Sequence, residues 1–142
     1  MARSAAVLSV TAALVAALDL AHKTVALAEP ADAVVLHPRS ALYAVAVGAI
    51  SALWAAAILL TRSASIALGG GVFLGGAAGN VVSLALWPSL DGVPNPLVAG
   101  DVAFNVADLA VAFGLALVLG SAVVFAARHR TRLGEPVRFS RS

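Results

Sequence analysis

Residues 40–61 read SALYAVAVGAISALWAAAILLT, a stretch that contains no Asp, Glu, Lys or Arg. A membrane-spanning helix needs about 20 predominantly apolar residues, so this stretch is long enough to cross a bilayer. Three more apolar stretches flank it, at about residues 5–28, 63–90 and 104–127. The sequence therefore predicts an all-α fold, an integral membrane four-helix bundle, with an irregular Pro-rich outer loop before the fourth helix.

The composition excludes several other classes of protein. Of the 142 residues, 61% are hydrophobic and 11% are charged, whereas a soluble domain averages about 25% charged residues. A chain with so few charges cannot cover a water-facing surface, and so many hydrophobic residues are incompatible with intrinsic disorder. The absence of cysteine excludes a disulfide scaffold. Because the basic residues gather in the C-terminal tail, no nucleic-acid partner is expected.

The arginines predict how the four spans are oriented. Four spans place both termini and the turn at Arg62 on one side of the membrane. That side carries seven basic residues, against Arg39 and Lys23 opposite: Arg3, Arg62, Arg128, Arg130, Arg132, Arg138 and Arg141. The positive-inside rule then predicts a multi-pass protein of the cytoplasmic membrane with both termini in the cytoplasm. Residues 1–127 would form the membrane domain, and residues 128–142 a basic tail that acts as a stop-transfer anchor or binds membrane lipid.

The first apolar stretch also permits a second interpretation. Arg3 precedes it, and Ala26-Leu27-Ala28 resembles the small-residue cleavage site of a secretory signal. Asp19 and Lys23 argue against that alternative, because the apolar region of such a signal is neutral. We therefore expect this stretch to be the first span.

Polar residues of three predicted spans share one depth. They lie toward the outer ends of the spans: Asp19 and Lys23 in the first, Asn80 and Ser83 in the third, and Asn105 and Asp108 in the fourth. Ionisable groups inside a bilayer are costly, and they mark candidate functional sites. Glycines at 71, 75 and 79 of the third span let neighbouring backbones approach closely. We expect this packing to bring Asn80 against the helices that carry the carboxylates.

Each of these side chains also has a purely structural interpretation. Asp19 and Lys23 are four residues apart on one helix face and could neutralise each other. Asn80 could serve only as an interhelical hydrogen-bonding group. Asp108 or Asn105 could cap the fourth helix.

Three segments resemble the lipoprotein signal peptidases, also called type II signal peptidases. Residues 19–23, DLAHK, are similar to an Asp and Lys of the family's first helix, and residues 75–80, GGAAGN, to its third-helix glycine run. Residues 104–108, FNVAD, match its fourth-helix Phe-Asn-x-Ala-Asp. The family members are four-helix membrane aspartic proteases that cut signal peptides from lipid-modified precursors at the outer membrane face. The resemblance implies that Asp108 is one of two catalytic aspartates.

The chain also departs from the family pattern. The family's Gly-Asn is followed two residues later by Asp-Arg, where this chain has Ser83 and Leu84. The family's Asn-x-Gly-Ala-Ala-Phe-like stretch between the first two spans is absent. The best counterpart of the second catalytic aspartate is Asn95, and an amide cannot share a proton with Asp108 as a second carboxyl does. Asp101 or Asp91 could supply that carboxyl instead.

The resemblance thus implies aspartic-type cleavage of signal peptides, with a lipidated precursor or signal-peptide helix as partner. In an active enzyme Asp108 and a second aspartate, Asp101 or Asp91, would hold a water against the scissile bond. Three further side chains would orient the peptide backbone or the carboxylates: Lys23, Asn80 and Asn105. A first alternative is a non-catalytic relative that binds the same segments, and a second is a small proton-coupled transporter using Asp108 or Asp19. Transporter sites usually lie near the bilayer midplane. Asp19 and Asp108 are instead expected toward the outer ends of their spans, which disfavours the second alternative.

The histidines predict neither a metal site nor an organic cofactor. His22, His37 and His129 are scattered along the chain and form no ligand spacing. His37 and Arg39 are expected in a solvated loop, or in contact with a lipid headgroup or substrate.

Overall fold

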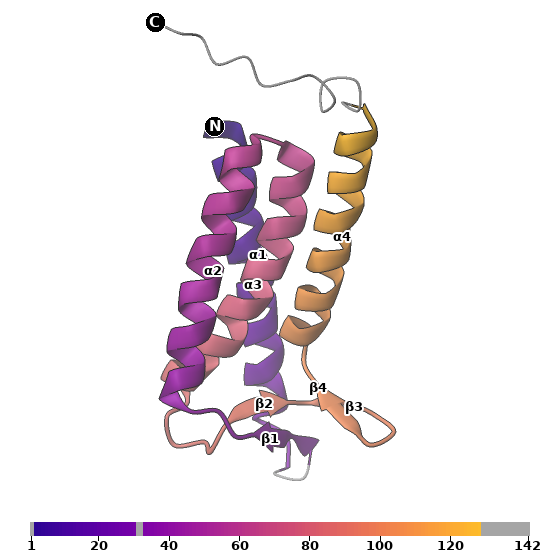
Figure 1. Cartoon of the computed structure of the whole chain (residues 1–142). Coiled ribbons are helices and arrows are strands. Elements are labelled where there is room, and N and C mark those ends of the chain that lie inside the picture. Colours follow the sequence, from indigo (N-terminus) through magenta and orange to yellow (C-terminus); the bar gives the residue numbers. More distant parts are fainter. Residues whose placement is uncertain (1, 31–32, 129–142) are drawn as a thin grey trace, which may run out of the picture.

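The computed structural model describes residues 2–30 and 33–128. Its four helices form an elongated bundle (Figure 1): α1 (Ala2–Ala26), α2 (Ala41–Thr61), α3 (Ala64–Leu86) and α4 (Val106–Arg128). Each helix is long and apolar enough to cross a membrane. The prediction of an all-α, four-span membrane fold is confirmed, and the predicted tail lies beyond the described residues except for Arg128.

Local sequence explains where the helices begin and end. The hydroxyl of Ser40 accepts a hydrogen bond from the first turn of α2, and the hydroxyl of Ser63 does the same for α3. Between the two helices Arg62 adopts the left-handed conformation, with φ of 54°, and ends α2. α3 ends at Leu86, shortly before Pro88, because proline cannot continue a helix.

Four short strands occupy the loops at one end of the bundle. β1 (Val35–His37) pairs with β2 (Val93–Asn95), and β3 (Leu97–Ala99) pairs with β4 (Val102–Phe104), both in antiparallel register. The predicted loop before the fourth helix is thus irregular only in part, because three of its segments form the short strands β2, β3 and β4. Gly100, with φ of 58°, lets the chain turn between β3 and β4. The end of the bundle that carries the four strands is called the strand end. The opposite end, where α1 begins and α4 ends, is called the terminal end (Figure 1).

Glycines set the close spacing between α3 and two of its neighbours. A Cβ added to Gly71 or Gly75 would lie 2.7 Å or 2.6 Å from a backbone oxygen of α1. A Cβ added to Gly76 would lie 2.4 Å from a backbone oxygen of α4, and one added to Gly114 of α4 would lie 2.3 Å from a backbone nitrogen of α3. The predicted close packing along the glycine stripe is confirmed, and it makes α3 the central helix.

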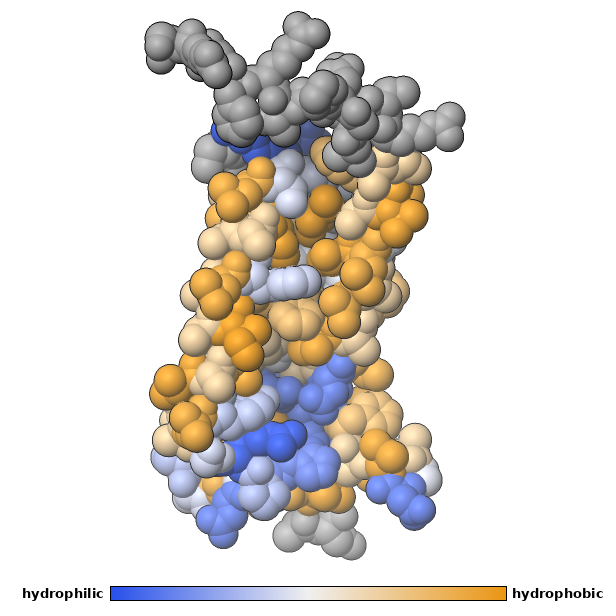
Figure 2. All heavy atoms as spheres, viewed as in Figure 1, coloured by the Kyte–Doolittle hydropathy of each residue, from blue (hydrophilic) through white to orange (hydrophobic). Residues whose placement is uncertain are grey.

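The second helix, α2, packs more loosely against this centre. Ile58 is its one buried residue, whereas about half of α3 is buried. Leu42, Leu53 and Leu60 are each more than 70% exposed. Figure 2 shows apolar side chains along the flanks of the helices and hydrophilic side chains gathered at the strand end. Large apolar groups on an outer surface require an apolar surrounding, which a bilayer supplies.

Candidate functional site

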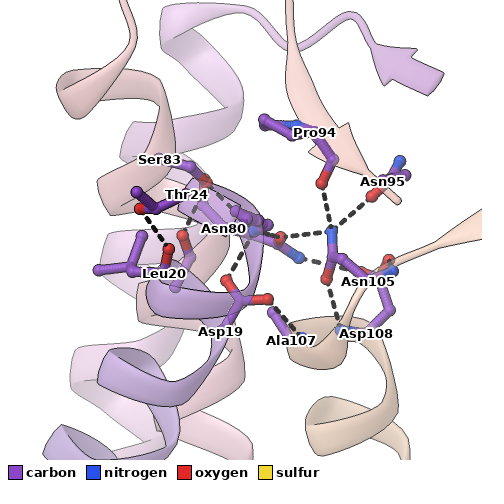
Figure 3. A network of polar contacts seen from close by, with 12 residues as sticks. Asp19, Leu20, Thr24, Asn80, Ser83, Pro94, Asn95, Asn105, Ala107 and Asp108 are labelled. Atoms are coloured by element: carbon purple, nitrogen blue, oxygen red, sulfur yellow. Dashed lines mark hydrogen bonds and ion pairs between the residues drawn. The ribbon is translucent and has the colours of Figure 1, made fainter. Parts of the chain in front are cut away.

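Polar side chains from three helices and one strand meet near the strand end (Figure 3). All but Asp108 are buried, and the group consists of Asp19, Lys23, Asn80, Ser83, Asn95, Asn105 and Asp108. Direct hydrogen bonds join α1 to α3 and α3 to α4 within this group. The predicted gathering of polar groups from separate spans at one depth is confirmed.

Asp19 and Lys23 form a buried ion pair. Lys23 Nζ lies 2.6 Å from Asp19 Oδ2, and neither side chain has any exposed surface. The same ammonium donates to Asn80 Oδ1 at 2.8 Å and to Ser83 Oγ at 3.2 Å. The other carboxylate oxygen of Asp19 accepts from the backbone N–H of Ala107 at 2.8 Å. The two charges therefore satisfy each other inside the protein and tie α1 to both α3 and α4, which supports their structural interpretation.

Gly79 provides the space that this ion pair needs. A Cβ at residue 79 would lie 2.6 Å from Asp19 Oδ2. The backbone oxygen of Gly79 also accepts a hydrogen bond of 2.7 Å from Ser83 Oγ. The glycine immediately before Asn80 thus has a packing role next to the site.

Asn80 is the centre of the network. Its Oδ1 accepts from Lys23 Nζ and, at 3.0 Å, from Asn105 Nδ2. Its Nδ2 donates to Asp108 Oδ1 at 2.9 Å. In this orientation the acceptor oxygen faces a cation and the donor nitrogen faces a carboxylate, so the one amide stabilises both charges.

Asn105 and Asp108 cap α4 together. The backbone N–H of Asp108 donates to Asn105 Oδ1 at 2.9 Å, and the backbone N–H of Asn105 donates to Asp108 Oδ2 at 3.2 Å. This reciprocal pair is a capping box, which explains an Asn and an Asp three residues apart at a helix start. The predicted capping interpretation is confirmed for both residues. Asp108 nevertheless remains exposed, and its other oxygen is held by Asn80.

Asn95 is buried beside Asn105. Its Oδ1 accepts from Asn105 Nδ2, and its Nδ2 contacts Nδ1 of His37. His37 belongs to β1, and the β1–β2 pairing brings it next to the site although 58 residues separate it from Asn95. His37 therefore lies in a short strand, half-buried against Asn95, rather than in the solvated loop that was expected, whereas Arg39 is exposed in the loop that follows. No local pattern in the sequence predicts that these two short segments pair.

The other two candidate aspartates do not join Asp108. Asp101 is exposed in the turn of the β3–β4 hairpin, which projects away from the bundle (Figure 1). Asp91 lines a separate cavity together with Arg39. Within residues 2–30 and 33–128, the hydrogen bonds to the Asp108 carboxylate come from Asn80 and from the backbone of Asn105. Neither of these groups is a carboxyl.

A groove opens between α2 and α4, with α3 as its floor. Its volume is about 260 Å³. Asn80 and Asp108 supply polar groups to it, and the remaining lining is mostly apolar: Tyr43, Val47, Ile50, Ser51, Phe73, Ala77 and Val111. The groove is therefore mostly apolar, and the exposed Asp108 carboxylate lies on its wall.

In the part of the chain that the structure describes, no three His, Asp or Glu side chains gather as a metal site would require. Comparison with protein-family models, curated proteins and solved structures finds no significant match.

Proposed function

We propose that this chain is a lipoprotein signal peptidase-like membrane protein that binds a lipidated or signal-peptide segment without cleaving it efficiently. The observation that carries the proposal is the environment of Asp108. This carboxylate faces an apolar groove on the flank of the bundle, and its side-chain neighbour is an amide rather than a second carboxyl.

The groove matches the chemistry of such a segment. A signal peptide has an apolar stretch that lies in the membrane and a more polar end that lies at the membrane surface. Val47, Ile50 and Val111 offer an apolar wall for the first part. Asp108 offers an acceptor for backbone N–H groups of the second, and a hydrogen bond to a charged group is worth about 1.5 to 3 kcal/mol.

The same environment argues against efficient hydrolysis. An aspartic protease needs two neighbouring carboxyls that share a proton, so that one activates water while the other protonates the substrate. The position that the family resemblance assigns to the second carboxyl carries Asn95, which is engaged with Asn105 and His37. An amide can neither accept nor release that proton, so Asp108 would act alone.

The charge distribution supports an orientation with the strand end outside and both termini in the cytoplasm. Arg3 lies in the first turn of α1, Arg62 joins α2 to α3, and Arg128 ends α4, so all three are at the terminal end. Positive charges on one side of a set of spans favour the cytoplasmic location of that side. The chain has no native cysteine, so Asp101→Cys and Arg62→Cys variants can be labelled on intact cells with a membrane-impermeant maleimide. Labelling of Asp101→Cys alone is expected, and labelling of Arg62→Cys alone would contradict the orientation.

Binding and cleavage are tested with the full chain in lipid nanodiscs and a fluorescent, lipidated signal peptide. The wild type is expected to bind the peptide and to cleave it no faster than empty nanodiscs do. Asp108→Asn should weaken binding about tenfold, the equivalent of one charged hydrogen bond. Asp101→Asn is the matched control, because this aspartate lies outside the groove, and it should bind like the wild type.

Two outcomes would overturn parts of this proposal. Binding no stronger than to empty nanodiscs would reject the peptide site. Rapid cleavage by the wild type that Asp108→Asn abolishes would replace the binder with a peptidase. Asn95→Asp separates the two cases, since cleavage that appears only in this variant would show that the missing carboxyl is what prevents hydrolysis.

A further inference from the structure

α3 and α4 separate toward the terminal end of the bundle. They are in close contact at Gly69, where an added Cβ would lie 2.8 Å from the backbone nitrogen of Val118. Only two residues further along α4, a Cβ added to Gly120 would meet nothing within 4 Å. Gly120 is therefore not required for helix contact, unlike Gly69 and Gly114, and it borders open space.

A cavity of about 510 Å³ lies between the first turn of α3 and the last turns of α4. Ser63, Ser65 and Arg128 give it a polar, cationic rim at the terminal end. Leu117 and Val124 contribute an apolar wall deeper in the bundle. The cavity is thus polar where the helices end and apolar where they would enter the hydrocarbon region.

The charges around this cavity are of one sign. The described charged residues at the terminal end are Arg3, Arg62 and Arg128. The described carboxylates lie elsewhere, in the half of α1 nearer the strand end, in the first turn of α4 and in the loops of the strand end. The ion pair that the described chain contains, between Asp19 and Lys23, is also remote from this cavity. An anionic group entering the cavity would therefore meet positive charge, and none of the described carboxylates lies beside it.

We infer that this cavity binds an anionic phospholipid of the cytoplasmic leaflet. The Arg128 guanidinium presents several N–H donors to the phosphate, for which arginine is well suited. The hydroxyl of Ser65 adds a donor, and the upper part of one acyl chain lies against Leu117 and Val124. A soluble phosphate compound lacks the chain that these two residues contact. The site is separate from the groove of Asp108, and it does not depend on peptide binding there.

The test compares phosphatidylglycerol with phosphatidylcholine of identical acyl chains. The full chain is purified in detergent, each lipid is added, and native mass spectrometry measures the fraction of protein that retains lipid. The wild type should retain phosphatidylglycerol preferentially. Arg128→Gln should lower that retention about fivefold, the expected effect of one basic residue on an anionic lipid.

Matched variants distinguish lipid binding in the cavity from a general attraction of anionic lipid to the basic end of the bundle. Arg62→Gln removes a positive charge from the same end but outside the cavity, and it should retain the lipid. Gly120→Leu should fill the cavity and abolish the preference. Gly48→Leu changes a glycine on α2 that likewise borders open space, and it should leave the preference unchanged. Circular dichroism verifies that each variant is folded, and Ser65→Ala, with a smaller expected loss, replaces any variant that is not.

Three results would overturn the inference. The first is equal retention of the two lipids by the wild type. The second is an equal loss in Arg62→Gln and Arg128→Gln, which would indicate general surface attraction. The third is displacement of the lipid by soluble glycerol phosphate, which would indicate a site for free phosphate compounds instead.

Discussion

The two sides of α3 are joined to their neighbours in different ways. Toward α1 and α4, glycines bring backbones into contact, and a buried ion pair and Asn80 link the three helices. Toward α2, the contact is made by side chains, such as Trp54 and Phe73, whose ring centroids lie 5.6 Å apart. α1, α3 and α4 therefore form a frame that fixes the polar groups, whereas α2 is a more loosely packed wall of the groove.

The largest expected effect comes from breaking the frame at its ion pair. Lys23→Met leaves the buried Asp19 carboxylate without its partner, and it should lower the free energy of unfolding by about 3 to 5 kcal/mol. Unfolding in mixed micelles, followed by circular dichroism, measures the loss. The double variant Asp19→Leu, Lys23→Met should lose less than Lys23→Met alone, because no unpaired charge stays buried. If Lys23→Met were as stable as the wild type, the ion pair would not hold the frame together.

A smaller loss is expected where α3 and α4 meet. The added methyl group of Gly114→Ala would lie 2.3 Å from the backbone nitrogen of Phe73. Backbone cannot yield as a side chain does, so the free energy of unfolding should fall by about 3 kcal/mol. Gly120→Ala, in the same helix but beside open space, should change it by less than about 0.5 kcal/mol. Equal losses in the two variants would contradict the close contact at Gly114.

The interface between α3 and α2 should tolerate an added methyl group better than the interface between α3 and α4 does. A Cβ at Gly70 would lie 2.2 Å from Cδ1 of Ile58, which is the far end of a flexible side chain. Ile58 can change rotamer, so Gly70→Ala should cost about 1 kcal/mol in the same unfolding assay. A loss as large as that of Gly114→Ala would show that α2 is held as firmly as α4.

A smaller effect on stability than at Gly114 or at the ion pair is expected at Asp108. Asp108→Asn retains one side-chain oxygen for the hydrogen bond from the backbone N–H of Asn105, but it loses the acceptor for Asn80 Nδ2. With one hydrogen bond lost at an exposed residue, the free energy of unfolding should fall by about 0.5 to 1 kcal/mol. Peptide binding should nevertheless weaken. Measuring the free energy of unfolding and the peptide affinity on one preparation separates the binding role of Asp108 from its capping role. If both fell in parallel, Asp108 would have a capping role only.

The sequence predicts most of the helical frame, because long apolar runs and helix caps depend on neighbouring residues. The site is predicted in part for the same reason, since Asp19 and Lys23 share a helix face and Asn105 and Asp108 share a helix turn. The contact between His37 and Asn95 could not be predicted, because it depends on the pairing of two three-residue strands far apart in the chain. Only the three-dimensional path of the chain shows that Asp101 is turned away from Asp108.

The most direct test asks whether a signal-peptide segment lies in the groove between α2 and α4. Because the chain lacks cysteine, single cysteines can be placed at Ile50 and Val111 in the groove and at Leu14, which is exposed on α1 outside it. Each variant is then cross-linked to a lipidated signal peptide that carries one thiol-reactive group. Cross-links are expected at Ile50→Cys and Val111→Cys, with only background at Leu14→Cys and loss of the groove cross-links when unlabelled peptide competes. Cross-linking at Leu14→Cys as strong as in the groove would contradict the proposed binding site.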